Sequence, residues 1–326
     1  MNRYFTIDVI KVILALFVVM LHSPVYSANP EITKGIEGIY SIAVPLFFCF
    51  SGFFFRKTGS KCNKTVKRIL ILYLFWLIPS FPLVLGQRFN EDLTIIQYIQ
   101  QFIFSSSYSV SWYLVAMIWC VIICYITRKL NPSIVFIIAV FLYTLCVCHL
   151  WLRQLVADTF ISSLIMGYQK VFGTVVWSFP QGLIYFLIGY NFNDNKFINS
   201  SSFRLWTIGL LSLSFVLYFC EIYCVEFTTG ERTRGYMMMP LLVYSIFNAS
   251  IYFSHPTMYV EEGKMLRNVS TLLYLSHPII MAIGFKLFGF IGIQRFWFVL
   301  LIFAIMCPAY FYLKKKTKFG WLKYAC

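Results

Sequence analysis

Long runs of apolar residues, separated by short polar segments, repeat along the whole chain. A transmembrane helix needs about 20 predominantly apolar residues, because it rises only ~1.5 Å per residue through a hydrocarbon layer ~30 Å thick. Ten runs meet this requirement, at residues 6–27, 36–55, 67–86, 111–127, 133–151, 175–192, 204–222, 236–253, 269–289 and 295–313. The pattern therefore predicts an all-α fold: one domain over residues 1–326, built as a bundle of about ten transmembrane helices.

The composition agrees with a membrane protein. Of the 326 residues, 60% are hydrophobic and only 12% are charged, whereas a soluble domain carries about 25% charged residues. The 35 Phe and 22 Tyr residues add more apolar side chain than one globular core would hold. The lipid bilayer is therefore expected to cover the rest of this surface.

Positive charge dominates, with a formal net charge of +15. A strongly basic chain can bind nucleic acid, but these Lys and Arg residues lie in short clusters between the apolar runs, as the positive-inside rule describes. With ten spans and a cytoplasmic N-terminus, 19 of the 27 Lys and Arg residues fall on the inner side. We therefore expect a multi-pass protein of the cell membrane with both termini in the cytoplasm and no nucleic-acid partner.

The first apolar run also resembles a signal peptide, because it follows Arg3 and precedes the small-residue stretch 25–28. Asp8 and Lys11 argue against this interpretation, since the apolar core of a signal peptide does not normally begin beside an acidic residue. We therefore expect the run to remain as the first helix. Cleavage would remove His22 from the mature chain.

The ten Cys residues form no CxxC pair and no Cys/His spacing typical of a zinc site, so no metal site is predicted. Most of them lie inside apolar runs, where a free Cys behaves as a small hydrophobic residue. Cys220 and Cys224 lie near the outer end of one run, where a disulfide remains open.

Three ionisable residues, Asp8, Lys11 and His22, lie in or beside the first apolar run. Such residues within a membrane are costly and often functional. Their spacing places them on one stripe of the helix. Asp8 and Lys11 are close enough to pair, whereas Lys11 and His22 are about 16 Å apart along the axis and cannot contact the same reacting atom. Lys11 and His22 can instead contact the two ends of a long ligand. In the alternative interpretation, Asp8 and Lys11 form an ion pair near the inner headgroups and His22 bonds to the backbone.

Several short motifs, in order along nearly the whole chain, resemble the membrane acyltransferase-3 family. Ile7-Asp8-x-x-Lys11 followed by Leu21-His22 is similar to the opening of that family, which usually has Arg at the position of Lys11. The further similarities are residues 43–53 to its second span, Lys67-Arg68-Ile69 to the basic entry of its third, Ser111-Trp112-Tyr113-Leu114 to the start of its fourth, and residues 273–278 to its late Tyr-Leu-x-His element.

The resemblance implies an integral membrane O-acyltransferase. Such an enzyme passes an acyl group, usually acetyl, from cytoplasmic acyl-CoA to a hydroxyl group of a sugar or another cell-envelope acceptor. Acyl-CoA is then a donor substrate, and no permanently bound cofactor is expected.

The same resemblance assigns roles to the residues of the first span. Neutral imidazole suits removal of a hydroxyl proton near pH 7, so His22 is expected to act as base or as transient acyl carrier, with Asp8 as a second catalytic residue. Lys11, Lys67 and Arg68 are expected to attract the phosphates of CoA. Because Lys holds phosphate as a point charge rather than as a planar fork, position 11 is also where donor use would differ from that of the family.

His277 lies in the ninth apolar run, directly before a proline. It is expected either to be a further catalytic residue, which lines the same cavity, orients His22 or binds substrate, or to pack beside a proline kink. The outer loops at 87–110 and 152–174 are the longest connections. They either hold binding residues or act as solvated connectors.

Three more residues are candidates for substrate binding. Ser51, next to Gly52, either places a hydroxyl group in the cavity or belongs to a small-residue pair that allows helices to approach closely. Trp112 and Tyr113 either stack on an acceptor sugar or anchor their helix at the membrane interface.

A carrier or flippase that exports a small or lipid-linked glycan is the main alternative function, because a charged stripe inside a membrane also suits a substrate path. A purely structural membrane scaffold is a third interpretation. It leaves Asp8, Lys11 and His22 without a purpose.

Overall fold

A computed structural model describes residues 4–23, 29–88, 94–105, 110–150, 156, 158–192, 201–229, 235–254 and 260–326. Within these residues the secondary structure is helical, with no strand, which confirms the expected all-α class. The stretch 25–28, which we considered as a cleavage site, and parts of the two longest loops lie outside the described residues.

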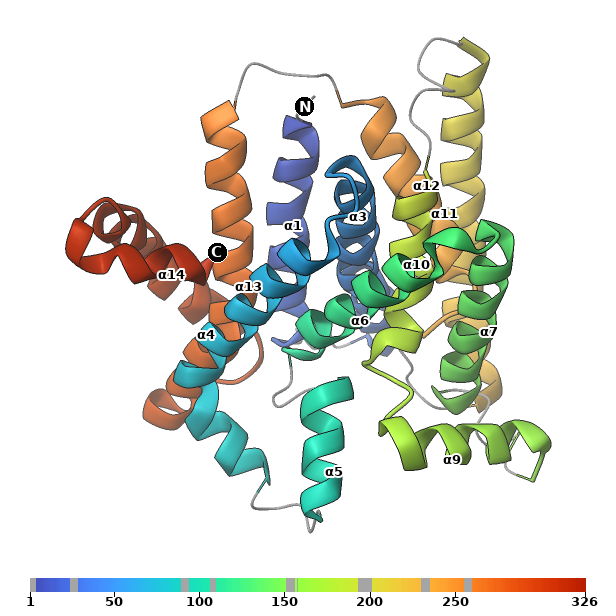
Figure 1. Cartoon of the computed structure of the whole chain (residues 1–326), viewed down its shortest axis with the longest axis horizontal. Helices are drawn as coiled ribbons and strands as arrows, with labels where there is room; N and C mark the ends of the chain where they lie inside the picture. Colours follow the sequence, from blue (N-terminus) through green and yellow to red (C-terminus); the bar gives the residue numbers. More distant parts are fainter. Residues whose placement is uncertain are drawn as a thin grey trace.

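The helices follow the order of the apolar runs (Figure 1). The α-helices are α1 (Phe5–Leu21), α2 (Pro30–Ser41), α3 (Ala43–Lys57), α4 (Cys62–Arg88), α5 (Ile95–Gln100), α6 (Trp112–Ile126), α7 (Pro132–Leu150), α9 (Phe160–Phe172), α10 (Phe179–Asn191), α11 (Ser201–Thr229), α12 (Met239–Tyr252), α13 (Val260–Phe288) and α14 (Gly292–Lys314). Three shorter elements are the π-helix η1 (Gln101–Ser105) and the 3₁₀ helices η2 (Thr127–Lys129) and η4 (Thr317–Ala325).

Seven helical segments of the described chain are long and apolar enough to cross a membrane. They are Glu31–Lys57, Cys62–Leu83, Trp112–Lys129, Pro132–Leu150, Leu205–Cys224, Glu261–Phe288 and Gly292–Lys314. The other three expected spans correspond to shorter helices, because α1 has 17 residues, α10 has 13 and α12 has 14. Prolines explain two of these cases. Pro180 and Pro240 lie in the first turn of α10 and α12, where a missing N–H is tolerated and where a helix therefore starts.

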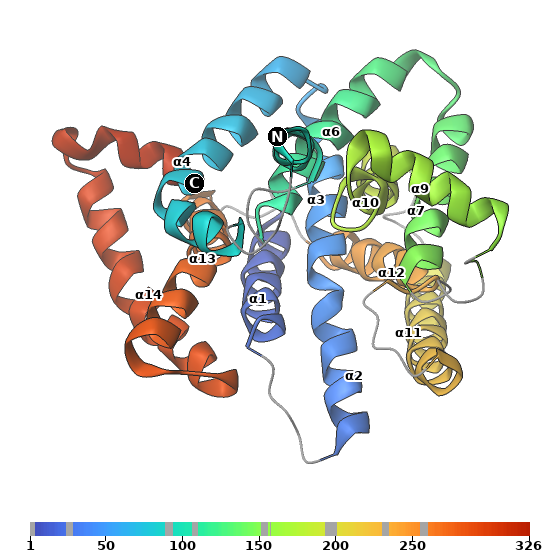
Figure 2. The ribbon, with the colours of Figure 1, turned by 90° about the horizontal axis from the view of Figure 1, so that it is seen from below.

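Large apolar side chains are exposed on the flanks of the bundle, among them Ile78, Trp206 and Ile305. Figure 2 shows α14 and α11 on opposite flanks, with α1 and α3 between them. A continuous exposed apolar surface of this kind is one that lipid covers. The chain is a multi-pass membrane protein.

Two glycines allow α3 and α10 to pack backbone to backbone. A Cβ atom at Gly52 would overlap the carbonyl oxygen of Phe186, and a Cβ atom at Gly189 would overlap the carbonyl oxygen of Cys49. Small residues permit such close approach between helices in membranes. Of the pair 51–52, Gly52 therefore provides the packing contact.

We expect Gly189→Ala to destabilise the protein by about 1–3 kcal/mol, because the added methyl group forces two backbones apart. Gly209→Ala is the matched control: its Cβ has no neighbouring atom within 4 Å, and Ala favours a helix over Gly by ~1 kcal/mol. Denaturation of both variants in detergent measures the difference. Equal stability of the two variants would contradict the close contact.

Candidate active site

Helices α1 and α13 frame the candidate site. Arg267 near the start of α13 pairs with Asp8 near the start of α1, while the Ser23 hydroxyl, just past the end of α1, donates to the Met281 sulfur at 3.8 Å. The two helices therefore run side by side in the same direction. We call the two ends of this pair the Asp8 end and the His22 end.

Four charged residues gather at the Asp8 end, and we call them the charged cluster: Asp8, Lys11, Arg68 and Arg267. The Asp8 carboxylate is buried, and Arg267 Nη1 donates to its Oδ2 at 2.5 Å. Gly263 makes this approach possible, since a Cβ atom there would lie 2.8 Å from the same oxygen. The buried carboxylate is thus compensated by a cation from another helix, as a charge in a low-dielectric environment requires.

Lys11 completes the charged cluster, but through different contacts from those of Arg267. Its ammonium group lies 4.6 Å from the ring centroid of Phe54 and 5.8 Å from that of Phe50. Its charge also interacts with the charges of Asp8, Arg68 and Arg267. Three cations thus share one region with a single carboxylate, which leaves an excess of positive charge.

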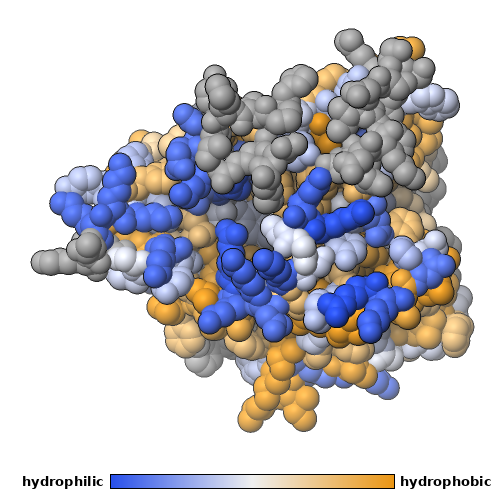
Figure 3. Space-filling view, turned by 45° about the horizontal axis from the view of Figure 1, so that its top comes forward, coloured by the Kyte–Doolittle hydropathy of each residue, from blue (hydrophilic) through white to orange (hydrophobic). Residues whose placement is uncertain are grey.

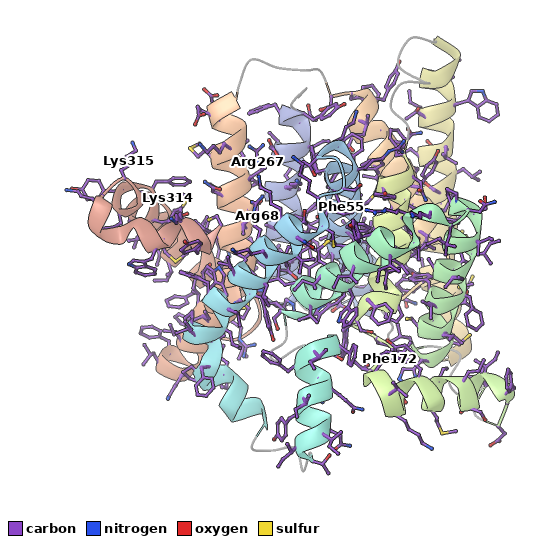
Figure 4. The ribbon with its side chains drawn as sticks, viewed as in Figure 1. Phe55, Arg68, Phe172, Arg267, Lys314 and Lys315 are labelled. Atoms are coloured by element: carbon purple, nitrogen blue, oxygen red, sulfur yellow. The ribbon has the colours of Figure 1, made fainter. Side chains whose placement is uncertain are left out.

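This region opens toward one face of the molecule. Arg68 is exposed and the Arg267 side chain is partly exposed, and Figure 4 shows the two near each other where α4 and α13 approach α1. Figure 3 shows hydrophilic residues gathered on this face around a recess, with hydrophobic residues along the sides. Lys67 is exposed, and within the described part of the chain no contact joins it to the charged cluster.

At the His22 end, two imidazole rings lie together. The ring centroids of His22 and His277 are 5.3 Å apart, and the rings are tilted by 32°. His277 is completely buried, whereas His22 is partly exposed. His22 is therefore the ring that a substrate can reach, and His277 lies behind it.

Pro278 determines how His277 is held. Proline has no N–H, so the carbonyl oxygen of Tyr274, four residues earlier, lacks its usual helical donor. His277 Nδ1 lies 2.7 Å from this oxygen. A carbonyl oxygen can only accept, so Nδ1 carries the hydrogen and Nε2 of the neutral ring presents a lone pair. Among the described residues, no hydrogen-bond partner of Nε2 is found.

Aromatic side chains connect this pair to three of the substrate-binding candidates. The Tyr274 ring lies 6.1 Å from His277 and 5.5 Å from Tyr113, and the Tyr113 hydroxyl shares a hydrogen bond of 3.2 Å with Ser51. We call His22, His277, Tyr274, Tyr113 and Ser51 the histidine cluster. Trp112 lies beside it, because Phe48 contacts both Trp112, at 5.9 Å, and Tyr113, at 4.8 Å, between ring centroids.

The structure thus divides the predicted site residues between two places. His22, His277, Tyr113 and Ser51 lie in the histidine cluster, while Asp8 belongs to the opposite end, about 21 Å from His22 along α1 at 1.5 Å per residue. Asp8, which we expected as a second catalytic residue, therefore lies far from the imidazole pair, and its catalytic role stays a prediction.

Arg267 is not among the predicted site residues, because Lys11 alone was expected to pair with Asp8. A signal was present. A basic residue stands eleven positions before His22 in α1 and ten positions before His277 in α13. The structure shows what this repeated spacing means: two parallel helices with cations at one end and imidazoles at the other.

Within the described residues, no group of three or more His, Cys, Asp or Glu side chains is arranged to hold a metal ion. The ten Cys residues are free thiols, and Cys220 and Cys224 are exposed without a bridge between them.

Comparison with known proteins identifies the family of the chain. A family model described as an acyltransferase domain matches residues 4–314. The chain is also similar to two proteins of Enterococcus faecalis, each named amino-acid racemase. The first is 20% identical over 318 residues, covering 92% of this chain and 44% of the relative, and the second is 24% identical over 273 residues, covering 77% and 36%. The chain thus spans less than half the length of these relatives. No solved structure matches it.

Proposed function

Because the chain belongs to the acyltransferase-3 family and is therefore a membrane acyltransferase, we propose that it moves an acyl group from cytoplasmic acyl-CoA to a hydroxyl group of a sugar or another cell-envelope acceptor. One observation carries this proposal. The parallel helices α1 and α13 hold cations at one end and paired imidazoles at the other. A donor with a polyanionic head and a reactive thioester at the end of a long arm fits this separation.

The charged cluster receives the head of the donor. Lys11, Arg68 and Arg267 exceed Asp8 in charge, and two of the three cations reach the polar face. Cations in a partly enclosed site attract phosphate groups and hold them by charge-assisted hydrogen bonds. The pantetheine arm then extends along α1 over the ~16 Å between Lys11 and His22, and the Asp8 end faces the cytoplasm.

His22 carries the chemistry, because it is the exposed member of the imidazole pair. As base, it removes the proton of the acceptor hydroxyl while the oxygen attacks the thioester carbonyl. The C–S bond breaks, and the CoA thiolate leaves and takes up the proton. As acyl carrier, His22 attacks the thioester carbonyl first and the CoA thiolate leaves. The acceptor oxygen then takes the acyl group from His22, and the freed imidazole takes up the hydroxyl proton. His277 acts behind His22 as a positioning residue, with its Nε2 lone pair available to a ring N–H.

The donor assignment predicts a defect that depends on phosphate. We expect Lys11→Ala to raise KM for acetyl-CoA about tenfold with little change in kcat, since a charge-assisted hydrogen bond contributes ~1.5–3 kcal/mol and remaining cations compensate in part. The measurement is release of free CoA by purified protein in liposomes. With acetyl-pantetheine, which has no phosphate, the same substitution should leave KM unchanged.

Lys264→Ala is the matched control for this experiment. Lys264 lies on α13 and is exposed beside Glu261, away from the described contacts of the charged cluster. It should retain the wild-type KM for both donors. If Lys11→Ala raises KM equally for acetyl-CoA and acetyl-pantetheine, Lys11 does not bind the phosphate groups. If wild type cleaves no thioester with any acceptor, acyl-CoA is not the donor.

A carrier that exports a small or lipid-linked glycan is the second candidate, because charged residues buried between α1 and α13 also suit a substrate path. A carrier would bind its substrate and respond to a gradient without consuming acyl-CoA. The activity named for the two Enterococcus relatives is not carried over, since most of each relative lies outside the matched region.

A further inference from the structure

A second group of aromatic residues lies where η1 and α9 pack against α6 and α10, and the proposed chemistry does not use these residues. Figure 1 shows α5 and α9 at the end of the molecule opposite the N-terminus, which is the His22 end. The long loops singled out in the sequence contribute these elements. Their packing brings five rings together, and we call them the aromatic platform: Phe104, Trp119, Tyr168, Phe172 and Phe179.

The platform is continuous from ring to ring. Centroid distances from Phe172 are 5.1 Å to Phe104, 4.9 Å to Tyr168 and 6.2 Å to Phe179. Trp119 stacks on Phe104 at 5.2 Å and contacts Phe179 at 6.2 Å. All five side chains are partly exposed. Figure 4 shows Phe172 at the end of α9 nearest α5.

Hydrogen bonds fix the backbone under the platform. The Gln100 amide donates to the carbonyl oxygens of Lys170 and Val171, at 2.8 and 3.2 Å, and so caps the last turn of α9. The Trp119 indole donates to the Ile103 carbonyl at 2.8 Å, which ties η1 to α6. The rings are therefore preorganised before any ligand arrives.

Polar groups without partners accompany the rings. The Ser105 hydroxyl and the Gln101 side-chain oxygen are buried, and neither has a hydrogen-bond partner among the described residues. Ser105 is only 5% exposed. Both belong to the π-helix η1, a rare element that often occurs at functional sites. Buried polar groups in proteins are normally bonded, so these two point to a ligand.

Gly173 lies beside the Ser105 hydroxyl. It ends α9 with a φ of +81°, a conformation that other residues rarely adopt. A Cβ atom at this position would lie 3.5 Å from Ser105 Oγ, an ordinary van der Waals distance. The backbone conformation therefore favours glycine beside the hydroxyl.

Helix α6 joins the platform to the histidine cluster. Trp119 follows Trp112 by seven residues, about 10 Å along the axis, and Tyr113 belongs to the histidine cluster. A molecule held on the platform can thus extend a hydroxyl group toward His22.

We propose that the aromatic platform binds a pyranose ring of the acceptor glycan, with the apolar ring face against the aromatic side chains and Ser105 and Gln101 bonded to its hydroxyl groups. A sugar ring has one apolar face and a polar edge, which matches rings flanked by a hydroxyl and an amide oxygen. Since none of these seven side chains is charged, a neutral sugar fits better than a phosphate or carboxylate. This inference rests on the proposed function, because the glycan is the acceptor there.

Binding can be tested without the donor. Full-length protein in lipid nanodiscs is titrated with methyl glucoside, methyl galactoside and diacetylchitobiose, and saturation-transfer NMR gives each Kd. Wild type should bind at least one of these sugars, and Phe172→Ala should weaken that binding about tenfold through loss of the central ring. Phe172→Leu, which retains most of the volume, separates loss of the ring from loss of folding. Trp206→Ala removes an exposed ring on α11 and should leave the Kd unchanged.

Any of three results would contradict sugar binding by the aromatic platform: no sugar binding by wild type, equal Kd values for wild type and Phe172→Ala, or saturation transfer to lipid chains alone. Thioester cleavage by wild type is measured separately. Sugar binding without cleavage would defeat the proposed function and leave the platform, whereas cleavage without sugar binding would do the reverse.

Discussion

Replacement of His22 with Ala is expected to lower the rate of acyl transfer by at least about 10²-fold, because a positioned base contributes 10²–10⁴. The KM for acetyl-CoA should change little, since the charged cluster that receives the donor lies at the other end of α1. The measurement is CoA release by purified protein at several donor concentrations. This division between kcat and KM is the reverse of the one expected for Lys11→Ala.

His149→Ala is the matched control, because it removes a different imidazole from the end of α7. It should retain the wild-type rate. If His22→Ala and wild type release CoA equally fast, His22 has no role in the chemistry. Incubation of wild type with acetyl-CoA alone then separates the two possible roles: a burst of CoA release equal to the amount of enzyme identifies a carrier, and release that begins only when the acceptor is added identifies a base.

The position of His22 could be predicted because it depends on local spacing. Residues 8, 11 and 22 share one helix face by periodicity alone, and α1 has that geometry. The neighbour of His22 could not be predicted from local spacing. His277 lies on a helix 255 residues later in the chain, and only the packing of α1 against α13 brings the two rings to 5.3 Å.

The number of apolar runs could likewise be predicted from the sequence, whereas the lengths of the helices could not. Hydropathy located each of the ten apolar runs, because burial in lipid selects composition over the whole run. It did not determine where the helices begin. Pro180 and Pro240 set the first turns of α10 and α12 and leave them short, and such local backbone effects are invisible to an average over about 20 residues.

Ser51 shows why a residue with two plausible roles needs the fold. From the sequence, Ser51 and Gly52 formed one small-residue pair. In the structure Gly52 meets the backbone of α10, while the Ser51 hydroxyl bonds to Tyr113, 62 positions away. Adjacent residues on a helix point about 100° apart, so one packing surface cannot explain both.

Arg267→Ala is expected to destabilise the protein by about 3 kcal/mol, because it removes the guanidinium that compensates the buried Asp8 carboxylate. Breaking a buried ion pair costs ~3–5 kcal/mol, and the partial exposure of Arg267 places this case at the lower end. Denaturation in mixed micelles measures the free energy of unfolding. Lys264→Ala, which breaks an exposed pair with Glu261 on the same helix, should cost less than ~1 kcal/mol.

The double variant Asp8→Asn/Arg267→Gln distinguishes charge from packing. If the loss in Arg267→Ala comes from the ion pair that the buried carboxylate has lost, neutralising both partners should recover most of the stability, since the two amides can bond to each other. It should not recover donor binding in full, because the Arg267 guanidinium, which is partly exposed, can no longer donate to a phosphate group. A double variant as unstable as Arg267→Ala would instead assign the loss to packing of the Arg267 side chain between α1 and α13.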